Sequence, residues 1–156
     1  MLIDEMTREE CCTALTRVNL GRLACARDHQ PYLVPINFAY DGEHLYGLTT
    51  AGQKIDSMRS NPRVCLEIDE RASHYRWLSI VVLGRYEELP ETPACERART
   101  HALELLQRRE IWWQPVSVSR PGRKQRAPIF YRIHVVQMTG LRAEPDALEA
   151  ATVTAS

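Results

Sequence analysis

The chain has 156 residues, with 20 Lys and Arg side chains against 20 Asp and Glu, and 44% of its residues are hydrophobic. This length and composition suit one globular domain and exclude a disordered or collagen-like chain. A formal net charge of zero provides no overall attraction for nucleic acid or for an anionic membrane surface, so neither is an expected partner.

The sequence also predicts the cellular compartment of the protein. The N-terminus turns acidic at Asp4, and no basic stretch followed by an apolar run is present there, so secretion is not expected. No uncharged segment approaches the roughly 18 apolar residues that span a bilayer. Five cysteines without Cys-x-x-Cys spacing indicate reduced thiols. We therefore expect a soluble, cytoplasmic protein.

The first part of the chain predicts one helix followed by strands. Thr7 and Glu10 have the spacing of a capping box, so a helix should begin after Thr7 and end before Gly21. Segments rich in Val, Ile, Leu, Tyr and Phe predict strands over residues 21–26, 32–40 and 44–49. Asp41-Gly42 separates the last two, and because glycine tolerates the positive φ of tight hairpin turns, these strands should be antiparallel neighbours.

Two helices and three strands are predicted further on. The helices should cover residues 53–60, stopped by Asn61-Pro62, and residues 92–109, begun by Thr92 and Pro93. The strands should cover residues 64–68, 77–88 and 129–138. In the longest of them, the apolar run over residues 80–83 predicts burial on both faces, and Gly84 predicts a bulge.

These elements predict a mainly β fold. About six strands with helices at the edges are typical of a mostly antiparallel barrel. Residues 111–126 contain Trp112, Trp113 and several basic side chains between Arg120 and Arg126, and we interpret them as a surface loop. The domain should cover residues 1–142, and the small, polar residues 143–156 should form a disordered tail.

The segment from Thr49 to Lys54 is the best candidate for a ligand site. There a strand ends in two hydroxyl groups, Gly52 allows backbone amides to point inward, and Lys54 opens a short helix. Helix-start amides, the helix dipole and a lysine all favour an anion such as phosphate. Taken alone, the segment fits even better with an ordinary turn that Thr50 caps while Lys54 lies in solvent.

No other pattern predicts catalysis or a metal. A Gly-x-Ser-x-Gly motif is missing, and zinc-type spacing is missing among the histidines, which are His29, His44, His74, His101 and His134. The acidic pairs Asp69-Glu70 and Glu87-Glu88 lie at strand ends, where carboxylates are usually solvated. We therefore predict no catalytic side chain and no metal site.

Several short segments occur in a specific order between residues 7 and 142. They are Gly-Arg-Leu-Ala at 21–24, Pro-Tyr-Leu-Val-Pro-Ile-Asn-Phe at 31–38, Gly-Gln-Lys at 52–54, Asn-Pro-Arg-Val-Cys at 61–65, residues 77–85, and Tyr-Arg-Ile at 131–133 with Thr-Gly at 139–140. Together they resemble the FMN-binding split-barrel family related to pyridoxamine 5′-phosphate oxidase, and within it the nitroimidazole-resistance-type flavoproteins. The resemblance implies a six-stranded antiparallel split β-barrel, a homodimer, and FMN in each of two clefts at the subunit interface.

The resemblance also suggests how FMN is held. The phosphate would be held by Lys54 with the preceding hydroxyls, and Arg22, Arg59 or Arg85 would be a second cation. The ring would lie along residues 34–37, where Pro35 indicates an edge strand or a bulge. A strand that carries Trp77 and Ser79 on one face would approach it, from the same or the partner chain. The expected cofactor-binding residues are Val34, Pro35, Ile36, Asn37, Leu48, Thr49, Thr50, Gly52, Lys54, Trp77 and Ser79.

The function implied is a flavin-dependent oxidoreductase that passes electrons from NADH or NADPH to a small acceptor such as a nitroaromatic, a quinone or oxygen. Many resistance-type relatives carry a histidine where this chain has Leu48, so the resemblance does not identify the acceptor. One alternative is a flavin carrier or sensor without turnover. Another is a haem-binding split barrel in which His134 or His74 ligates iron.

Overall fold

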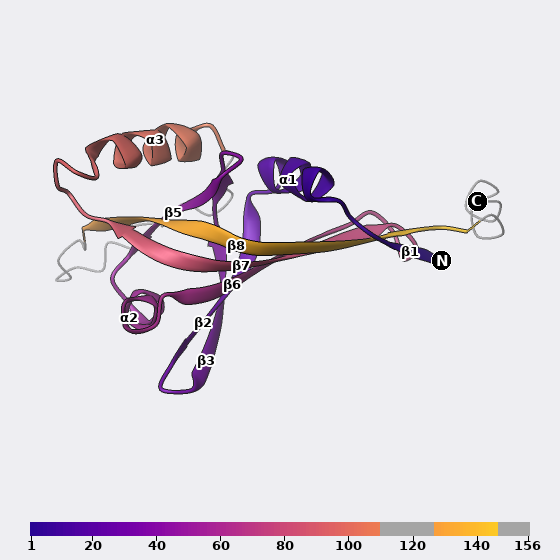
Figure 1. Cartoon of the computed structure of the whole chain (residues 1–156), viewed down its shortest axis with the longest axis horizontal. Coiled ribbons are helices and arrows are strands. Elements are labelled where there is room, and N and C mark those ends of the chain that lie inside the picture. The colour runs from indigo at the N-terminus through magenta and orange to yellow at the C-terminus, as the bar shows by residue number, and fades with distance from the viewer. Residues whose placement is uncertain (110–126, 147–156) are drawn as a thin grey trace, which may run out of the picture.

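The computed structural model describes residues 1–109 and 127–146, which form one antiparallel sheet with helices on both sides (Figure 1). The strands follow the order β3-β2-β6-β7-β8-β5-β4, and β1 pairs with β8. Their bounds are Leu2–Glu5 (β1), Leu20–Arg27 (β2), Gln30–Asn37 (β3), Ala39–Tyr40 (β4), His44–Thr50 (β5), Arg63–Arg71 (β6), Trp77–Leu89 (β7) and Pro128–Glu144 (β8). The helices are Arg8–Arg17 (α1), Gln53–Ser60 (α2) and Glu96–Gln107 (α3). A mainly β fold with an antiparallel, unclosed barrel is confirmed.

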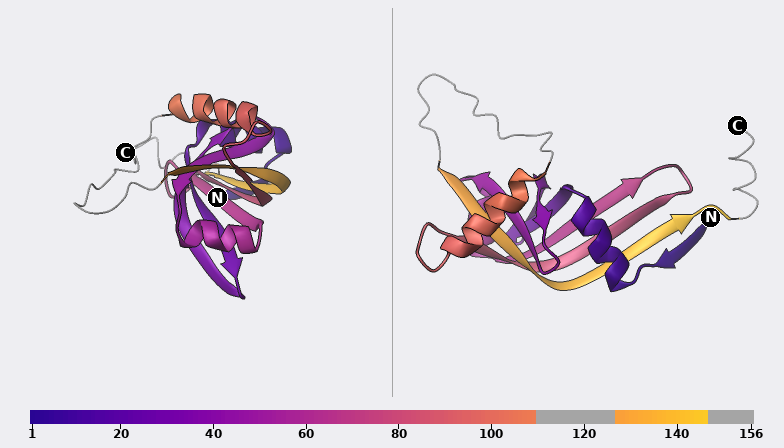
Figure 2. Two further views of the ribbon diagram at one scale, coloured as in Figure 1. Left: turned by 90° about the vertical axis from the view of Figure 1, so that its left-hand side faces the viewer. Right: turned by 90° about the horizontal axis from the view of Figure 1, so that it is seen from above.

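The three helices lie around a strongly coiled sheet. In the end-on view, α3 lies above the sheet and α2 below it, and α1 lies on the same side as α3 (Figure 2). The paired ends of β6 and β7 extend away from the barrel beside β1 and the last residues of β8. The sheet therefore has a barrel-like half, which carries α2 and α3, and an extended half.

Helix α1 begins as its capping box predicts. The Thr7 hydroxyl accepts a hydrogen bond from the Glu10 amide at 3.3 Å, and the Glu10 carboxylate accepts one from the Thr7 amide at 2.7 Å. At the other end, the Arg109 guanidinium donates to the carbonyls of Thr16, Arg17 and Val18. Both ends of α1 thus have partners for backbone groups that a helix leaves unpaired.

The long strands β7 and β8 form the centre of the sheet. Their register shifts between Leu83 and Gly84, which confirms the predicted bulge. The predicted burial of residues 80–83 on both faces is wrong. Ile80 and Val82 are buried, but Leu83 is 44% exposed, because only one face of β7 points into the barrel.

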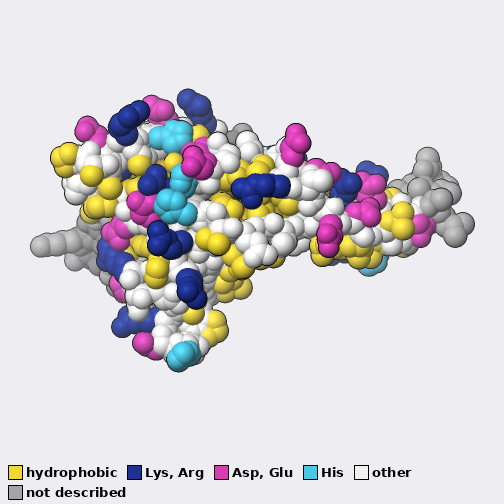
Figure 3. Space-filling view, viewed as in Figure 1, with side chains coloured by type: hydrophobic (Ala, Val, Ile, Leu, Met, Phe, Trp, Pro, Cys, Tyr) yellow, Lys and Arg dark blue, Asp and Glu magenta, His cyan; other side chains and the backbone are white. Residues whose placement is uncertain are grey.

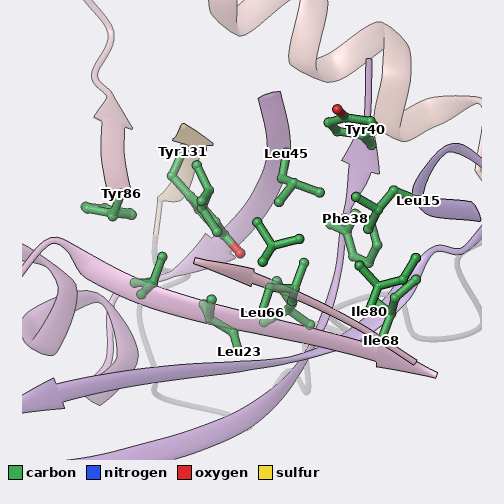
Figure 4. Packing of buried hydrophobic residues seen from close by; sticks show 14 of the residues in the cluster. Leu15, Leu23, Phe38, Tyr40, Leu45, Leu66, Ile68, Ile80, Tyr86 and Tyr131 are labelled. Atoms are coloured by element: carbon green, nitrogen blue, oxygen red, sulfur yellow. The ribbon is translucent and has the colours of Figure 1, made fainter. Parts of the chain in front are cut away.

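The core fills the inside of this barrel (Figure 4). Tyr131 of β8 is fully buried and packs over Gly47 of β5, where an added Cβ would lie 2.3 Å from the Tyr131 ring. A second apolar cluster lies under α3 and includes Ala102 and Leu106. The sequence thus places a glycine where a tyrosine ring needs the space above the strand.

Several predicted boundaries need correction. The strand predicted over 32–40 is interrupted at Phe38, and its last residues form β4, which pairs with β5 through the Asp41-Gly42 turn as expected. Helix α3 begins at Glu96 and not near Thr92, because residues 93–95 form a turn and no side chain caps the helix.

The predicted tail begins too early. Ala143 and Glu144 belong to β8 and pair with Ile3 and Leu2 of β1, a strand that the sequence did not suggest. Residues 147–156, like the predicted loop over 111–126 with Trp112 and Trp113, lie outside the described residues. All five cysteines are free thiols. Among the described residues, no helix has the length and apolar character needed to cross a membrane.

Candidate functional site at the β5–α2 corner

The predicted corner lies where β5 ends at Thr50 and α2 begins at Gln53. Gly52 is the N-cap residue, and no side chain makes a capping hydrogen bond to α2. The alternative in which Thr50 caps the helix is therefore wrong. The hydroxyl of Thr49 reaches only the Thr50 carbonyl, at 3.5 Å. An uncapped helix start with neighbouring hydroxyls can accept an anionic ligand.

Lys54 is half-buried at this helix start, beside β2. Burial lowers the pKa of Lys54, and the nearby Cys25 partly opposes this shift. In the described part of the chain, no acidic side chain pairs with the Lys54 ammonium and no hydrogen bond from it is found. A desolvated charge without a partner is costly, so this position favours an incoming anion.

The arginines considered as second cations differ in their partners. Arg22 pairs with Asp69 and Glu67, and Arg59 donates two hydrogen bonds, at 2.8 and 2.7 Å, to Glu88. Arg85 is exposed and makes no ion pair with any described residue. Two of the three candidates are therefore already neutralised within the chain.

The predicted ring-binding segment is an edge strand. β3 lies at one end of the sheet and pairs only with β2, so Pro35 occupies an edge position as expected. Ile36 is buried in the core, and the partly buried Val34 packs against the core. Strand β3 contacts β5, and α2 packs against β2. The strand that contains residues 34–37 is therefore in contact with the strand that leads to the corner.

Trp77 and Ser79 lie at the other end of the molecule. Thr50 pairs with Pro128 on β8, whereas Trp77 pairs with Ala143, fifteen residues further along the same strand. That separation corresponds to roughly 50 Å of extended strand. The two predicted halves of the site cannot meet within one chain.

A cavity of about 340 Å³ lies beside Trp77 and Ser79. It is lined by residues at the ends of β6 and β7 together with Met1. Both residues point to one face of β7, as predicted, and the Ser79 hydroxyl donates to Glu67 at 3.4 Å. The extended half of the sheet therefore carries an open pocket with an aromatic wall.

Sequence reasoning missed a polar cluster on β5, β7 and β8. Glu87, taken as solvated, accepts hydrogen bonds from Arg132 and His134, and these partners lower its pKa to about 2. The other ring nitrogen of His134 lies 3.1 Å from His44. Both ring nitrogens of His134 therefore take part in hydrogen bonds within the chain. The pairing of β5 with β8, which places His44 opposite His134, would have revealed this contact.

The chain is thus an antiparallel, split barrel in which helix α2 begins without a side-chain cap from any described residue. Comparison with known proteins identifies the family: the profile described as Pyridoxamine 5′-phosphate oxidase matches residues 7–142. The chain belongs to this family.

Individual proteins agree with this assignment. The uncharacterized protein RA0666 of Rhizobium meliloti (strain 1021) is 45% identical over 146 residues, covering 92% of this chain and 97% of that protein. A crystal structure of a FAD-binding protein from Mesorhizobium loti is similar with a TM-score of 0.77 and 39% identity, over 93% of this chain and 99% of that one. A FAD-binding protein from Mycobacterium smegmatis shares the fold, with a TM-score of 0.61 and 22% identity, over 88% of this chain and 97% of that one.

Proposed function

We propose that this protein binds a flavin nucleotide and acts as a flavin-dependent oxidoreductase. The observation that carries the proposal is Lys54, a half-buried ammonium that has no counter-charge among the described residues and lies at the uncapped start of α2. A flavin phosphate brings about −1.5 to −2 charges to such a position. Family membership and the FAD-binding relative with 39% identity support a flavin as the ligand.

Different residues near the corner bind the phosphate and the ring of FMN. Lys54 neutralises the phosphate, and the amides that follow Gly52 with the hydroxyls of Thr49 and Thr50 donate hydrogen bonds to it. The edge strand, from Val34 to Asn37, and Leu48 line the isoalloxazine ring. These apolar and backbone groups orient the ring without acid or base chemistry of their own.

A second copy of the chain completes each site. Trp77 and Ser79 lie too far from Lys54 to reach the same cofactor within one chain. On the outer face of the sheet, Leu33, Leu83 and Leu141 are 64%, 44% and 44% exposed, and an exposed apolar face of this kind is typical of a protein interface. We infer a homodimer in which the partner's β7 covers the ring.

A bound flavin would supply the redox chemistry, with reduced nicotinamide as the hydride donor and a small acceptor, a nitroaromatic, a quinone or oxygen, as the electron acceptor. The chain contributes binding, orientation and partial exclusion of water. Leu48 adds an exposed apolar side chain near the corner, which suits flat, uncharged acceptors.

Absorbance and anaerobic reduction test this proposal. The purified protein, or the protein incubated with FMN, should show the bands of an oxidised flavin, and NADH or NADPH should bleach them without oxygen. A protein that stays colourless after incubation with FMN and with FAD would overturn the flavin site. Bound flavin that neither nucleotide bleaches would favour a carrier or sensor.

The choice between FMN and FAD is tested separately. The relative from Mesorhizobium loti is described as FAD-binding, which makes FAD the second candidate. Chromatography of the cofactor released by acid distinguishes the two, and we expect FMN because the phosphate contacts at the corner suffice for a mononucleotide. Recovery of FAD alone would replace FMN and leave the role of Lys54 intact.

A further inference from the structure

A row of hydrogen-bonded side chains joins three strands beside α3, where histidines lie among charged groups (Figure 3). His44 of β5 and His134 of β8 are opposite each other, with 3.1 Å between His44 Nε2 and His134 Nδ1. The other nitrogen of His134, Nε2, contacts a carboxylate oxygen of Glu87 on β7. Arg132 donates to the same carboxylate at 2.6 Å. The pair thus links β5, β8 and β7 in one chain of contacts.

The contacts fix where the protons are. Hydrogen bonds from Arg132 and His134 lower the pKa of Glu87 to about 2, so its carboxylate is ionised and only accepts. His134 Nε2 must therefore carry the hydrogen. In the neutral ring, Nδ1 is then an acceptor, and His44 Nε2 must donate to it. Each ring of the neutral pair has one tautomer.

The same geometry limits how many protons the pair can gain. One added proton fits on His44 Nδ1, which lies 3.9 Å from a carboxylate oxygen of Glu43. A second would have to enter His134 Nδ1, where its hydrogen would meet the hydrogen on His44 Nε2 across 3.1 Å. Two imidazolium groups cannot keep this bond, because neither offers a lone pair.

We propose that His44 and His134 form an acid-sensitive latch, which fastens β5 to β8 and β7 while the pair carries at most one added proton and opens when it must carry two. The latch is separate from the flavin site and does not depend on it. It acts on β5, whose far end forms the β5–α2 corner.

Basic side chains near the two histidines disfavour the binding of a second proton. Arg85 of β7 pairs directly with His134 in the sheet register, and Arg132 is two residues away on β8. Burial lowers the pKa of His44, and the positive charges of His134 and Arg132 add to this effect. The surroundings therefore favour release of the second proton over its retention.

Acidic neighbours tie the latch to α3. Asp41, in the β4–β5 turn, accepts hydrogen bonds from the amides of Glu43 and His44 and lies 3.0 Å from His101 of α3. Asp41 and Glu43 each raise the pKa of His44, but less than burial and the basic groups lower it. Opening of the pair therefore loosens the β4–β5 hairpin together with its contact to α3.

The sign of the pH effect follows from proton counting. In the unfolded chain both histidines titrate near their ordinary pKa of about 6.5. The folded pair takes up one proton fewer, so below about pH 6.5 acidification favours unfolding, by up to about tenfold in the unfolding constant per pH unit. This extra dependence ends where the second proton binds to the folded protein.

Urea unfolding of the full chain between pH 7.5 and 5 tests the latch. The variant His44→Gln keeps an amide that can donate to His134 but does not titrate. The unfolding constant of the wild type should rise relative to that of His44→Gln by up to about tenfold per pH unit below pH 6.5. Parallel curves for the two proteins would overturn the proposal.

Two further measurements make the test specific. His29→Asn removes an exposed turn histidine at φ 63°, and asparagine tolerates that conformation, so its curve should follow the wild type. Amide exchange over residues 39–50 should be faster in the wild type than in His44→Gln at pH 5.5, but equal at pH 7.5. The same ratio at both pH values would contradict a latch. If His44→Gln does not fold, His134→Asn replaces it, with the same expected result.

Discussion

Among single residues, Lys54 should lower the stability of the folded chain but strengthen the binding of FMN. Its ammonium is desolvated and has no counter-charge within the described chain. We expect Lys54→Met to weaken FMN binding by about 1.5–3 kcal/mol, the worth of a charge-assisted contact. The same change should leave the apoprotein as stable as before or more stable, because an unpaired buried charge is removed. Fluorescence titration with FMN and urea unfolding measure the two effects.

Arg59 provides the matched control. Its guanidinium lies on the same helix but pairs with Glu88, so Arg59→Met should lower stability slightly and leave FMN affinity unchanged. Unchanged affinity in Lys54→Met, or equal losses in both variants, would remove Lys54 from the phosphate site.

Glu87 makes a separate prediction about acid stability. Its pKa is lowered from 4.5 to about 2 by Arg132 and His134, so its contribution is present above pH 4.5 and is lost as the pH falls toward 2. Glu87→Gln should lower stability at pH 7 by about 1 kcal/mol, a modest value because solvent partly screens this half-buried pair. The difference from the wild type should vanish near pH 2, as urea unfolding at several pH values can check. A difference that persists at pH 2 would assign the effect to packing.

The sequence predicts the role of residues whose partners are a few positions away. It does not predict the role of residues whose partners lie far away in the sequence. The Thr7–Glu10 cap and the position of Lys54 at a helix start follow from spacing within a few residues. The contact of His44 with His134 depends on the pairing of two strands ninety residues apart. For the same reason the sequence predicts a solvated Glu87, since its basic partners lie on β8.

Among the elements, those whose ends are marked by residues nearby in the chain agree best with the sequence. Helix α2 spans Gln53–Ser60 as predicted, because Asn61-Pro62 ends it locally. Strands β1 and β4 were missed or merged, because each is very short and is defined only by its partner strand. Burial on both faces of β7 failed for a related reason: the apolar run could not show that one face lies outside the barrel.

The close contact of β5 with β8 predicts a strong effect of one methyl group. A Cβ at Gly47 would lie 2.3 Å from the Tyr131 ring, whereas one at Gly52 would meet nothing within 4 Å. Gly47→Ala should therefore destabilise the protein by at least about 1–3 kcal/mol, the usual cost of overpacking. Gly52→Ala should change stability little. Thermal or urea unfolding compares them, and equal stability of the two variants would show that Tyr131 can move aside.

At the level of the whole molecule, the proposed dimer is the feature that depends most on contacts far apart in the sequence. Leu83 is 44% exposed on the outer face of β7, so Leu83→Glu should split the dimer and release flavin without unfolding the chain. Leu103→Glu, at a position 41% exposed on α3, should do neither. Sedimentation velocity and the flavin content per chain measure both effects. A monomeric wild type that still binds flavin would contradict the shared site.

The distance between the β5–α2 corner and Trp77 has a genetic consequence. If every cleft takes Lys54 from one chain and Trp77 from the other, a mixed dimer of Lys54→Met and Trp77→Ala chains contains one cleft with both defects and one with none. Two alleles that are each inactive alone should then complement one another when expressed together in one cell. Failure of every such combination would show that one cleft does not take Lys54 and Trp77 from different chains.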